Sequence, residues 1–442
     1  GSFVTVEMLP ADYGDALHLS YGDEQDQYHI WIDGGLVKSF TKGWRKRVRQ
    51  LGREGAEIDL LVVTHIDTDH INGVVKFLDK NQGGANPPVI IPVQDVWFNQ
   101  YRHIRACAEH DEDVRERPGG PLPQWRTEAD FIAEVAECSP RLAKLAERVA
   151  AAASPEEGPS GAGIRGVPGG RDLVSLLDGG YVSNAHFGDE AVMRRDAPPV
   201  VDLPGGAKAW VLSPDEKKII QLYHDWEAYL KKHHLSPILR VRGVGPMSRG
   251  DALVAGFVEQ LMLRRKSVFE PQCKGREEDL ALPIATLAER EFEEDGSHAN
   301  GSSIAFLFEF AGRKLLLAGD AYPSVMAEGL RKMGYSSAHP LTLDAFKVAH
   351  HGSRGNTSDE LLQLVRCDNY MISTNSVRFD HPDKECLARI IWANRDRENT
   401  TLYFNYDTTP AGAAIDVEAN RRRYGYAVRQ MPEEGLRFCS ME

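Results

Sequence analysis

A short apolar run that leads straight into a cluster of histidines and aspartates constrains this chain more than any other feature. The run, Leu60–Val63, has the length and the β-branching of a buried strand. The cluster follows immediately and extends from His65 to His70. Ligand-binding groups in open α/β sheets lie beyond the carboxyl ends of strands, so the position of this cluster indicates a functional site.

Two imidazoles and two carboxylates stand within these six residues, which predicts a metal site. Burying such groups without partners costs several kcal/mol, and a divalent cation removes that cost. Side chains of an extended loop point in different directions, so two cations can use four ligands more easily than one. The predicted ligands are His65, Asp67, Asp69 and His70. The alternative is a polar helix start, in which Asp67 or Asp69 caps the helix and both imidazoles are solvated.

Polar residues also follow predicted strands in the last third of the chain. If the two halves of the chain pack as a sandwich, all these strand ends share one rim with the first cluster. The positions are Asp320 after the strand Lys314–Ala318, His350 and His351 after Thr342–Val348, and His381 after Tyr370–Thr374.

The remaining pattern predicts an α/β chain with helical interruptions. Residues 102–149 are charged and helix-periodic, and residues 154–170 are rich in Pro, Gly, Glu and Ser, which indicates a flexible linker. Further strands are expected at Phe3–Leu9, Ala16–Tyr21, Tyr28–Asp33, Val89–Ile91, Val96–Phe98, Trp210–Leu212 and Ser303–Phe310, and helices at Phe40–Arg53, from Ile71 onward and after Asp215. The expected segments are 3–100 for the first half of the main domain, 101–200 for a helical insertion and linker, 201–234 for a return to the sheet, 235–295 for a second helical insertion, and 296–442 for the second half.

The charge of the chain limits its partners. A net charge of −13 does not suit a protein coated in nucleic acid, because phosphate contacts need local Lys and Arg. A local basic channel remains compatible with it. The candidate clusters are Arg45–Arg49, Arg264–Lys266 and Arg421–Arg423, and the alternative for each is a solvated helix or turn face.

Cysteine usage and hydropathy predict the compartment. The six cysteines are scattered and form no Cys-x-x-Cys pair, which is typical of reduced thiols. No segment approaches the ~18 apolar residues that a membrane span needs. We therefore expect a cytoplasmic protein without membrane contact.

The spacing of the first cluster carries a family resemblance. His65-x-Asp67-x-Asp69-His70 resembles the His-x-His-x-Asp-His signature of the metallo-β-lactamase fold, with the second His replaced by Asp. With that replacement the signature is similar to that of the branch that contains the nuclease-like domain of the competence protein ComEC and the phosphorylcholine esterases. The resemblance implies an α/β fold, an αββα sandwich of the metallo-β-lactamase type, with large helical insertions.

The resemblance also implies roles for individual residues. One metal would be bound by His65, Asp67 and His298, the other by Asp69, His70 and His381, and Asp320 would bridge them. Asn300 is the alternative to His298, as a polar group near the metals. Asp69 is also expected to act in catalysis. His350 or His351 would contact phosphate and serve as general acid, with Ser353 in support, although one of the two histidines could bind metal instead. Asp33 would hold the ligand loop.

This ligand set implies metal-assisted hydrolysis by two divalent ions, Zn²⁺ or Mn²⁺. Asp67 in place of His makes one site harder, which moves its preference towards Mn²⁺. The leading hypothesis is a phosphodiesterase or nuclease that acts on DNA or another nucleic acid. One alternative is hydrolysis of a small phosphodiester or ester. Another is an effector subunit whose helical insertions bind a partner protein that gates the site.

Overall fold

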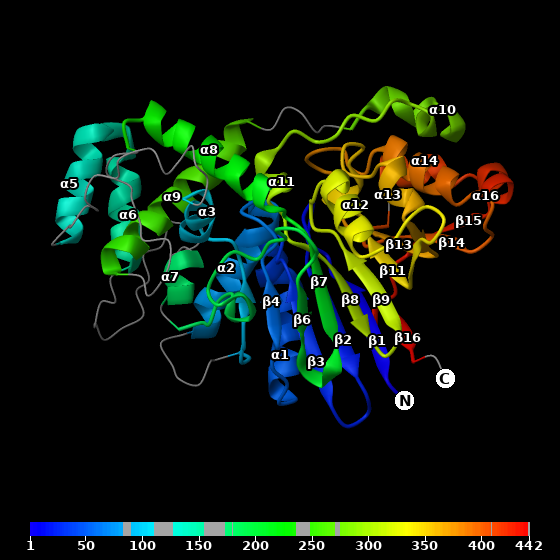
Figure 1. The fold of residues 1–442 in the computed structure, drawn as a ribbon, viewed down its shortest axis with the longest axis horizontal. Coiled ribbons are helices and arrows are strands. Elements are labelled where there is room, and N and C mark those ends of the chain that lie inside the picture. The colour runs from blue at the N-terminus through cyan, green and yellow to red at the C-terminus, as the bar shows by residue number, and fades with distance from the viewer. Residues whose placement is uncertain are drawn as a thin grey trace.

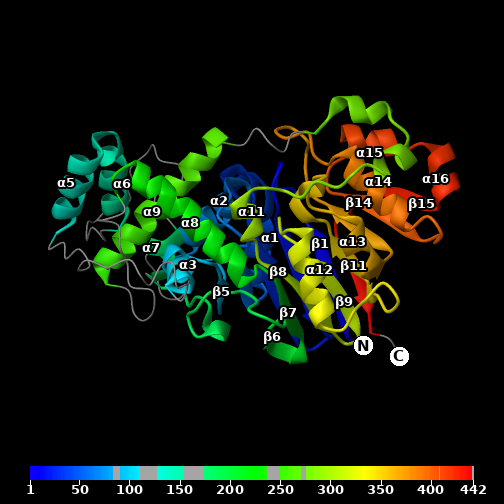
Figure 2. The ribbon, with the colours of Figure 1, turned by 45° about the horizontal axis from the view of Figure 1, so that its top comes forward.

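Two β-sheets lie face to face in the computed structural model, with helices on both outer sides (Figures 1 and 2). The structure describes residues 1–82, 90–109, 127–153, 173–178, 180–235, 248–269, 275–407 and 409–440. Within these residues the first sheet has the order β16-β1-β2-β3-β4-β5 and the second β15-β14-β13-β11-β9-β8-β7-β6. The chain end thus returns to the first sheet, where β16 pairs antiparallel with β1.

The strands of the first sheet are β1 (Phe3–Met8), β2 (Leu17–Gly22), β3 (Gln27–Ile32), β4 (Leu60–Val62), β5 (Val96–Trp97) and β16 (Leu436–Cys439). Those of the second are β6 (Val200–Asp202), β7 (Lys208–Ser213), β8 (Ala305–Phe310), β9 (Arg313–Leu317), β11 (Ala345–Lys347), β13 (Asn369–Ile372), β14 (Thr400–Phe404) and β15 (Tyr426–Gln430). A separate parallel pair is formed by β10 (Leu341–Leu343) and β12 (Val365–Cys367).

Three hydrophobic layers hold this sandwich together. The inner layer fills the space between the sheets and includes Leu60 and Val62 of β4. Leu61 and Val63 point the other way, into the layer beneath the helices of the first sheet. A third layer lies between the second sheet and its helices. Because β4 is buried on both faces, its sequence is a continuous apolar run without alternation.

The helices divide between the two outer faces. Those associated with the first sheet are the π-helix η1 (Ser39–Trp44), α1 (Arg45–Arg53), α2 (Thr68–Gln82), α3 (Tyr101–Ala108), α5 (Glu128–Cys138), α6 (Ala143–Ala153), α7 (Leu173–Asp178), α8 (Glu216–Lys232) and α9 (Arg249–Phe269). Towards the second sheet lie α10 (Ile284–Ala288), α12 (Pro323–Lys332), α13 (Asp359–Gln363), α14 (Lys384–Ala393), α15 (Pro410–Ile415) and α16 (Glu418–Tyr424). The short helix α11 (His298–Gly301) packs against α8, and its Ala299 belongs to the hydrophobic layer of the first sheet's helices. Short 3₁₀ segments are η2 (Pro140–Leu142), η3 (Ala185–Phe187), η4 (Pro204–Gly206), η5 (Glu277–Ala281) and η6 (Ala349–Gly352).

The helices interrupting the sandwich gather at one end of the molecule, where Figure 1 shows α5, α6, α7 and α9 beside α3 and α8. The expected linker at 154–170 and the side chains of Arg264–Lys266 lie outside the described residues. No helix in the described part of the chain is both long and apolar enough to cross a bilayer.

Two strand expectations were wrong. The segment expected as one strand, Thr342–Val348, is two, because Asp344 breaks the ladder and accepts hydrogen bonds from the Lys314 amide and the Arg313 guanidinium (both 2.7 Å). The expected strand Val89–Ile91 begins at a residue outside the described part. Its other two residues form no strand, because the Asn81 side chain accepts the amide hydrogens of Ile90 (3.0 Å) and Ile91 (2.9 Å).

Candidate metal centre

The loop that joins β4 to α2 carries the first polar cluster into the interior. Helix α2 begins at Thr68, because the Asp67 carbonyl accepts hydrogen bonds from the amides of His70 and Ile71 (both 2.9 Å). Asp69 and His70 therefore occupy its first turn, and the expected extended loop over these residues was wrong. The helix-start alternative was right about the helix and wrong about solvation, since the imidazoles of His65 and His70 are buried.

Asp33, at the end of β3, fastens this loop from behind. Its carboxylate accepts hydrogen bonds from the Thr64 amide (2.8 Å) and the Thr64 hydroxyl (2.7 Å). It also lies 2.7 Å from Nδ1 of His70. The expected supporting role of Asp33 is confirmed.

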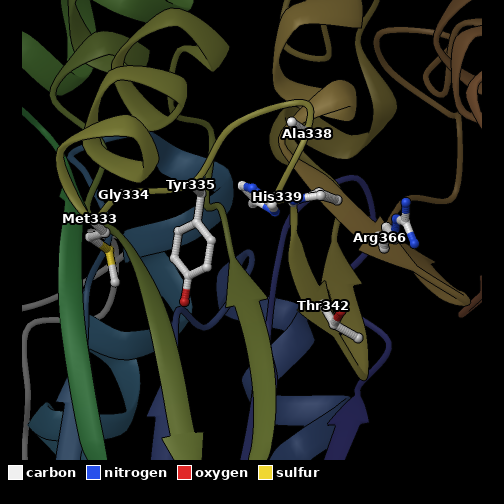
Figure 3. A pocket seen from close by; sticks show the side chains of 8 residues that line it. Met333, Gly334, Tyr335, Ala338, His339, Thr342 and Arg366 are labelled. Atoms are coloured by element: carbon white, nitrogen blue, oxygen red, sulfur yellow. The ribbon is translucent and has the colours of Figure 1, made fainter.

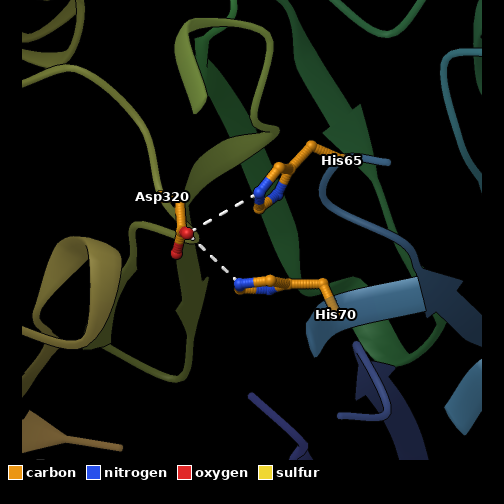
Figure 4. A group of neighbouring side chains, drawn as sticks. All are labelled: His65, His70 and Asp320. Carbon is orange, nitrogen blue, oxygen red and sulfur yellow. Dashed lines mark ion pairs between the residues drawn. The ribbon is translucent and has the colours of Figure 1, made fainter. Parts of the chain in front are cut away.

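Asp320 is the point at which the two halves of the chain meet. It follows β9, and its Oδ2 lies 3.2 Å from Nε2 of His70 and 3.6 Å from Nε2 of His65. Figure 4 shows both rings directed at this carboxylate from the opposite half of the chain. The Asp67 carboxylate lies 3.1 Å from the same nitrogen of His65. His65, His70 and Asp320 together form a buried group that could hold a metal ion.

His351 completes a second group beside the first. Its Nε2 lies 3.2 Å from Nε2 of His70, 3.3 Å from Oδ2 of Asp69 and 3.7 Å from Oδ2 of Asp320. Asp69, His70 and His351 form another buried set whose ligand atoms converge. The structure thus gives one of the two adjacent histidines a metal-facing position, which the sequence left open.

The donor atoms fit a cation. The Nδ1 atoms of His70 and His351 face acceptors, the carboxylate of Asp33 and the carbonyl of Ser373 (2.9 Å), so both Nε2 atoms direct lone pairs inward. Two such lone pairs 3.2 Å apart repel each other unless a proton or a cation lies between them. Oδ1 of Asp320 is also buried and has no hydrogen-bond partner among the described residues. A divalent cation bound here would satisfy all of these atoms.

Charge within the cluster reinforces this arrangement. Burial alone would raise the pKa of Asp320, but the positive histidines around it, His70 foremost, hold that pKa well below its ordinary value. Burial opposes the charge of His70, yet the neighbouring carboxylates raise its pKa well above the ordinary range. Burial likewise opposes the charge of His351, yet the carboxylates, Asp320 foremost, raise its pKa, so an incoming cation has to displace protons from these two imidazoles.

Asp15 supports the centre from the loop before β2. Its carboxylate pairs with the buried ammonium of Lys347, and its Oδ1 lies 3.3 Å from Nδ1 of His351. The preceding Gly14 permits close approach, because a Cβ there would lie 1.8 Å from the Asp69 carbonyl oxygen. The turn before β2 thus packs directly against the ligand helix.

His350 lies in a separate polar network on the edge of the centre. Its Nδ1 is 2.9 Å from the Asn356 side-chain oxygen and 3.4 Å from the Asp295 carboxylate, while its Nε2 faces Asp320 at 3.8 Å. Burial tends to raise the pKa of Asp295, but His350 and the surrounding donors lower it to about 2. Asn300 donates to the same carboxylate (2.7 Å).

The turn that presents His350 and His351 is strained. Both residues have positive φ, +47° and +56°, which residues other than glycine rarely adopt. Such conformations cost of order 1–3 kcal/mol each and concentrate at functional sites. Ser353 supports this turn through its amide, which donates to the His350 carbonyl (2.8 Å).

Two residues expected as ligands, His298 and His381, belong to none of the convergent groups of the described residues. The His298 side chain is exposed at the start of α11 and belongs to none of the convergent groups found in the described part of the chain. The neighbouring Asn300 is buried instead, because the cap of the short helix turns it inward. His381 is buried with its ring 5.2 Å from that of His350, and neither of its ring nitrogens has a hydrogen-bond partner among the described residues, but it belongs to none of the convergent groups.

Sequence reasoning missed three supporting residues, Asp295, Lys347 and Asn356. Asp295 ends an acidic stretch that composition assigns to solvent, and Asn356 follows the histidine turn without any apolar pattern. Lys347 occupies a strand position where a charged residue is unexpected. Only Lys347 could have been found from the sequence, because a lysine buried within an apolar strand needs a negatively charged partner.

A hollow on the molecular surface lies apart from this centre. Figure 3 shows it near the end of α12, with Tyr335, His339 and Arg366 in its lining. None of the predicted site residues lines it.

Comparison with known proteins agrees with this architecture. Residues 24–101 match the family model described as the metallo-beta-lactamase superfamily. The chain is 29% identical to ComE operon protein 3 of Bacillus subtilis (strain 168) over 118 residues. The aligned stretch covers 25% of this chain and 14% of that protein. The chain thus spans only a small part of this relative's length. Residues 24–101 are thus similar to the metallo-beta-lactamase superfamily, and the two-sheet α/β architecture of the chain, with its added helices, is that of the metallo-β-lactamase fold.

Proposed function

We propose that this metal-dependent hydrolase cleaves phosphodiester bonds in nucleic acid or nucleotides. The observation that carries the proposal is the convergence of His65, His70 and His351 on the Asp320 carboxylate from both halves of the chain. Divalent cations bound there would lower the pKa of water and neutralise charge on substrate oxygens. Two sequence features support a phosphodiester over other esters, because both resemble the nuclease-like branch: Asp67 in place of His, and the element His350-His351-Gly352-Ser353.

The residues around the centre have distinct roles in this proposal. His65, Asp67, Asp69, His70, Asp320 and His351 hold the metals. His350 donates the proton that the leaving oxygen needs, because its Nε2 faces the centre and the Asp295 carboxylate 3.4 Å from Nδ1 stabilises the protonated ring. Asp33 and Asp15 orient His70 and His351.

The distribution of basic residues favours a short substrate over a long duplex. The described basic clusters lie on α1 and α16, which are far apart in both views (Figures 1 and 2). Several of their guanidinium groups are paired locally: Arg47 with Glu7, Arg421 with Asp416 and Arg422 with Glu418. These clusters do not form one continuous phosphate-binding groove of the kind that duplex binding uses.

The test is incubation of the purified protein with single- and double-stranded DNA and RNA and with dinucleotides, in Mn²⁺ or Zn²⁺. We expect metal-dependent cleavage, strongest on single-stranded or short substrates, that Asp69→Ala and His70→Ala abolish. His339→Ala, which removes an exposed histidine from the surface hollow that none of the site residues lines, is the matched control. Absence of cleavage of every substrate by metal-loaded protein would refute the proposal.

A further inference from the structure

We propose that Tyr13, Arg378 and Phe379 form a stacking platform at the rim of the metal centre, which binds a nucleobase next to the scissile phosphate. This inference rests on the proposed function and specifies its substrate. The platform is assembled from the loop before β2 and the loop after β13.

The three side chains make one compact aromatic and cationic unit. The rings of Tyr13 and Phe379 meet edge to face, with centroids 5.6 Å apart. The Arg378 guanidinium carbon lies 5.4 Å from the Tyr13 centroid and 5.0 Å from the Phe379 centroid. One of its nitrogens also donates to the Tyr13 hydroxyl (2.9 Å). The guanidinium plane and both rings are therefore held in position before any ligand arrives.

The platform adjoins the centre through both of its loops. Tyr13 precedes Gly14, which touches the backbone of Asp69. The Phe379 ring lies 6.2 Å from that of His381, which in turn lies 5.2 Å from His350. A moiety stacked on the platform would thus lie one group away from a phosphate bound beside His350.

Accessibility distinguishes this unit from a core contact. Arg378 and its neighbour Val377 are exposed, the latter 77%, and the rings of Tyr13 and Phe379 are half-buried. An exposed valine beside an exposed arginine and two half-buried rings places apolar, aromatic and cationic groups together at the surface of the protein. The unit is built like the platforms on which single-stranded bases stack.

Its charge selects among ligands. A quaternary ammonium group would have to displace Arg378 from the rings that otherwise attract cations. A nucleobase can stack on a guanidinium or an aromatic ring, and the adjoining phosphate is attracted to the same arginine. The chemistry therefore fits an unstacked nucleotide, either at a single-stranded end or in a short nucleotide, rather than a phosphocholine.

The experiment compares kcat/KM for a single-stranded oligonucleotide, the same strand with abasic residues, a dinucleotide and the base-free diester methyl p-nitrophenyl phosphate. Relative to the base-free diester, Arg378→Ala and Phe379→Leu are each expected to lower kcat/KM for the base-bearing substrates about tenfold. The dinucleotide arm separates a free nucleotide from a strand end. Arg395→Ala is the control, because it also removes an arginine that covers an aromatic ring. The Arg395 guanidinium carbon lies 4.4 Å from the centroid of the Trp392 ring, at the C-terminal end of α14.

Tyr13→Phe keeps the ring and removes only the hydrogen bond from Arg378, so it separates stacking from loop stability. Fluorescence anisotropy of labelled oligonucleotide with Asp69→Ala protein, with and without Arg378→Ala, measures binding independently of turnover. Equal losses on base-bearing and base-free substrates, or a wild type indifferent to the base, would overturn the platform alone. No hydrolysis of any of these substrates, base-bearing or base-free, would overturn the proposed function and the platform with it.

Discussion

Asp33 determines which nitrogen of His70 faces the metal centre. Its carboxylate holds Nδ1 at 2.7 Å and so leaves Nε2 for Asp320 and a cation. In Asp33→Asn the amide can still accept from Thr64, but it no longer fixes the His70 tautomer. We expect affinity for Mn²⁺ or Zn²⁺ to fall about 10- to 100-fold in a calorimetric titration, with the fold retained by circular dichroism.

Asp59→Asn is the matched control for this change. Asp59 also lies beside β4 and also accepts a backbone hydrogen bond, from the amide of His29 (2.7 Å), but it is remote in the fold from the ligand loop, at the other end of the strand. Its metal affinity should equal that of the wild type. Equal affinity in Asp33→Asn would show that the carboxylate does not orient His70.

The same Asp59→Asn variant makes a prediction about pH. Burial raises the pKa of Asp59 from its ordinary value of 3.8 to about 6. Between these values the folded protein holds a proton that the unfolded chain has lost, so Asp59 lowers the free energy of unfolding as pH rises from about 4 to 6. We expect Asp59→Asn to stabilise the protein by about 1–2 kcal/mol at pH 8 and to have little effect at pH 4. Urea denaturation at the two pH values checks this, and a benefit confined to pH 4 would contradict it.

At individual positions, the sequence located the centre better than it assigned its ligands. His65, His70 and Asp320 lie where strand ends predict them. A strand end fixes where a residue lies but not where its side chain points, so the sequence could not show that His298 and His381 fall outside the convergent groups. His350 and His351 point to different parts of the centre because both have positive φ values. The sequence does not predict this conformation, since glycine is the residue that ordinarily indicates positive φ.

Among the elements, helix α2 is held against the first sheet by a contact between glycine backbones. A Cβ on Gly73 would lie 1.8 Å from the Gly34 carbonyl oxygen. Alanine is ordinarily the better helix residue, but Gly73→Ala should cost about 1–3 kcal/mol by forcing the helix outward. Because α2 carries Asp69 and His70 in its first turn, metal affinity should fall as well.

Gly43→Ala is the control for that substitution. Its Cβ would lie 3.5 Å from the Pro10 carbonyl oxygen, an ordinary contact, so we expect no loss of stability. Urea unfolding and metal titration of both variants make the comparison. A Gly73→Ala protein as stable as the Gly43→Ala protein would show that α2 can move without cost.

Elements were predictable where apolar runs are uninterrupted and less so where one polar side chain intervenes. The strands β1 to β4 follow directly from their apolar runs. Asp344 divides one expected strand and Asn81 prevents another, because each side chain satisfies backbone groups that a ladder would otherwise use. A buried side chain that competes for backbone hydrogen bonds gives little signal in hydrophobic periodicity.

For the whole molecule, the two-sheet sandwich was predictable from the sequence, but the pairing of the last strand with the first was not. The resemblance of the first cluster implied two packed sheets, and the structure contains them. The return of β16 to the edge of the first sheet joins residues more than 400 positions apart, such as Phe3 and Cys439. No local pattern specifies such a pairing, because the sequence pattern of an edge strand is the same whichever sheet the strand joins.

The metal ligands come from both halves of this sandwich, so a bound cation links one sheet to the other. His65 and His70 follow β4, while Asp320 and His351 follow β9 and β11. A ligand that binds only the folded state adds about 2.7 kcal/mol at a concentration 100 times its Kd. We therefore expect Mn²⁺ or Zn²⁺ to raise the Tm in a calorimetric scan. The cation should also merge any separate unfolding transitions of the two halves, and EDTA should reverse both effects.

Asp320→Asn should abolish this shift in Tm. The control is Asp196→Asn, which should retain the shift because Asp196 lies in an exposed ion pair with Lys332 (2.7 Å). A metal-induced shift that survives Asp320→Asn would place the cation outside the junction of the halves.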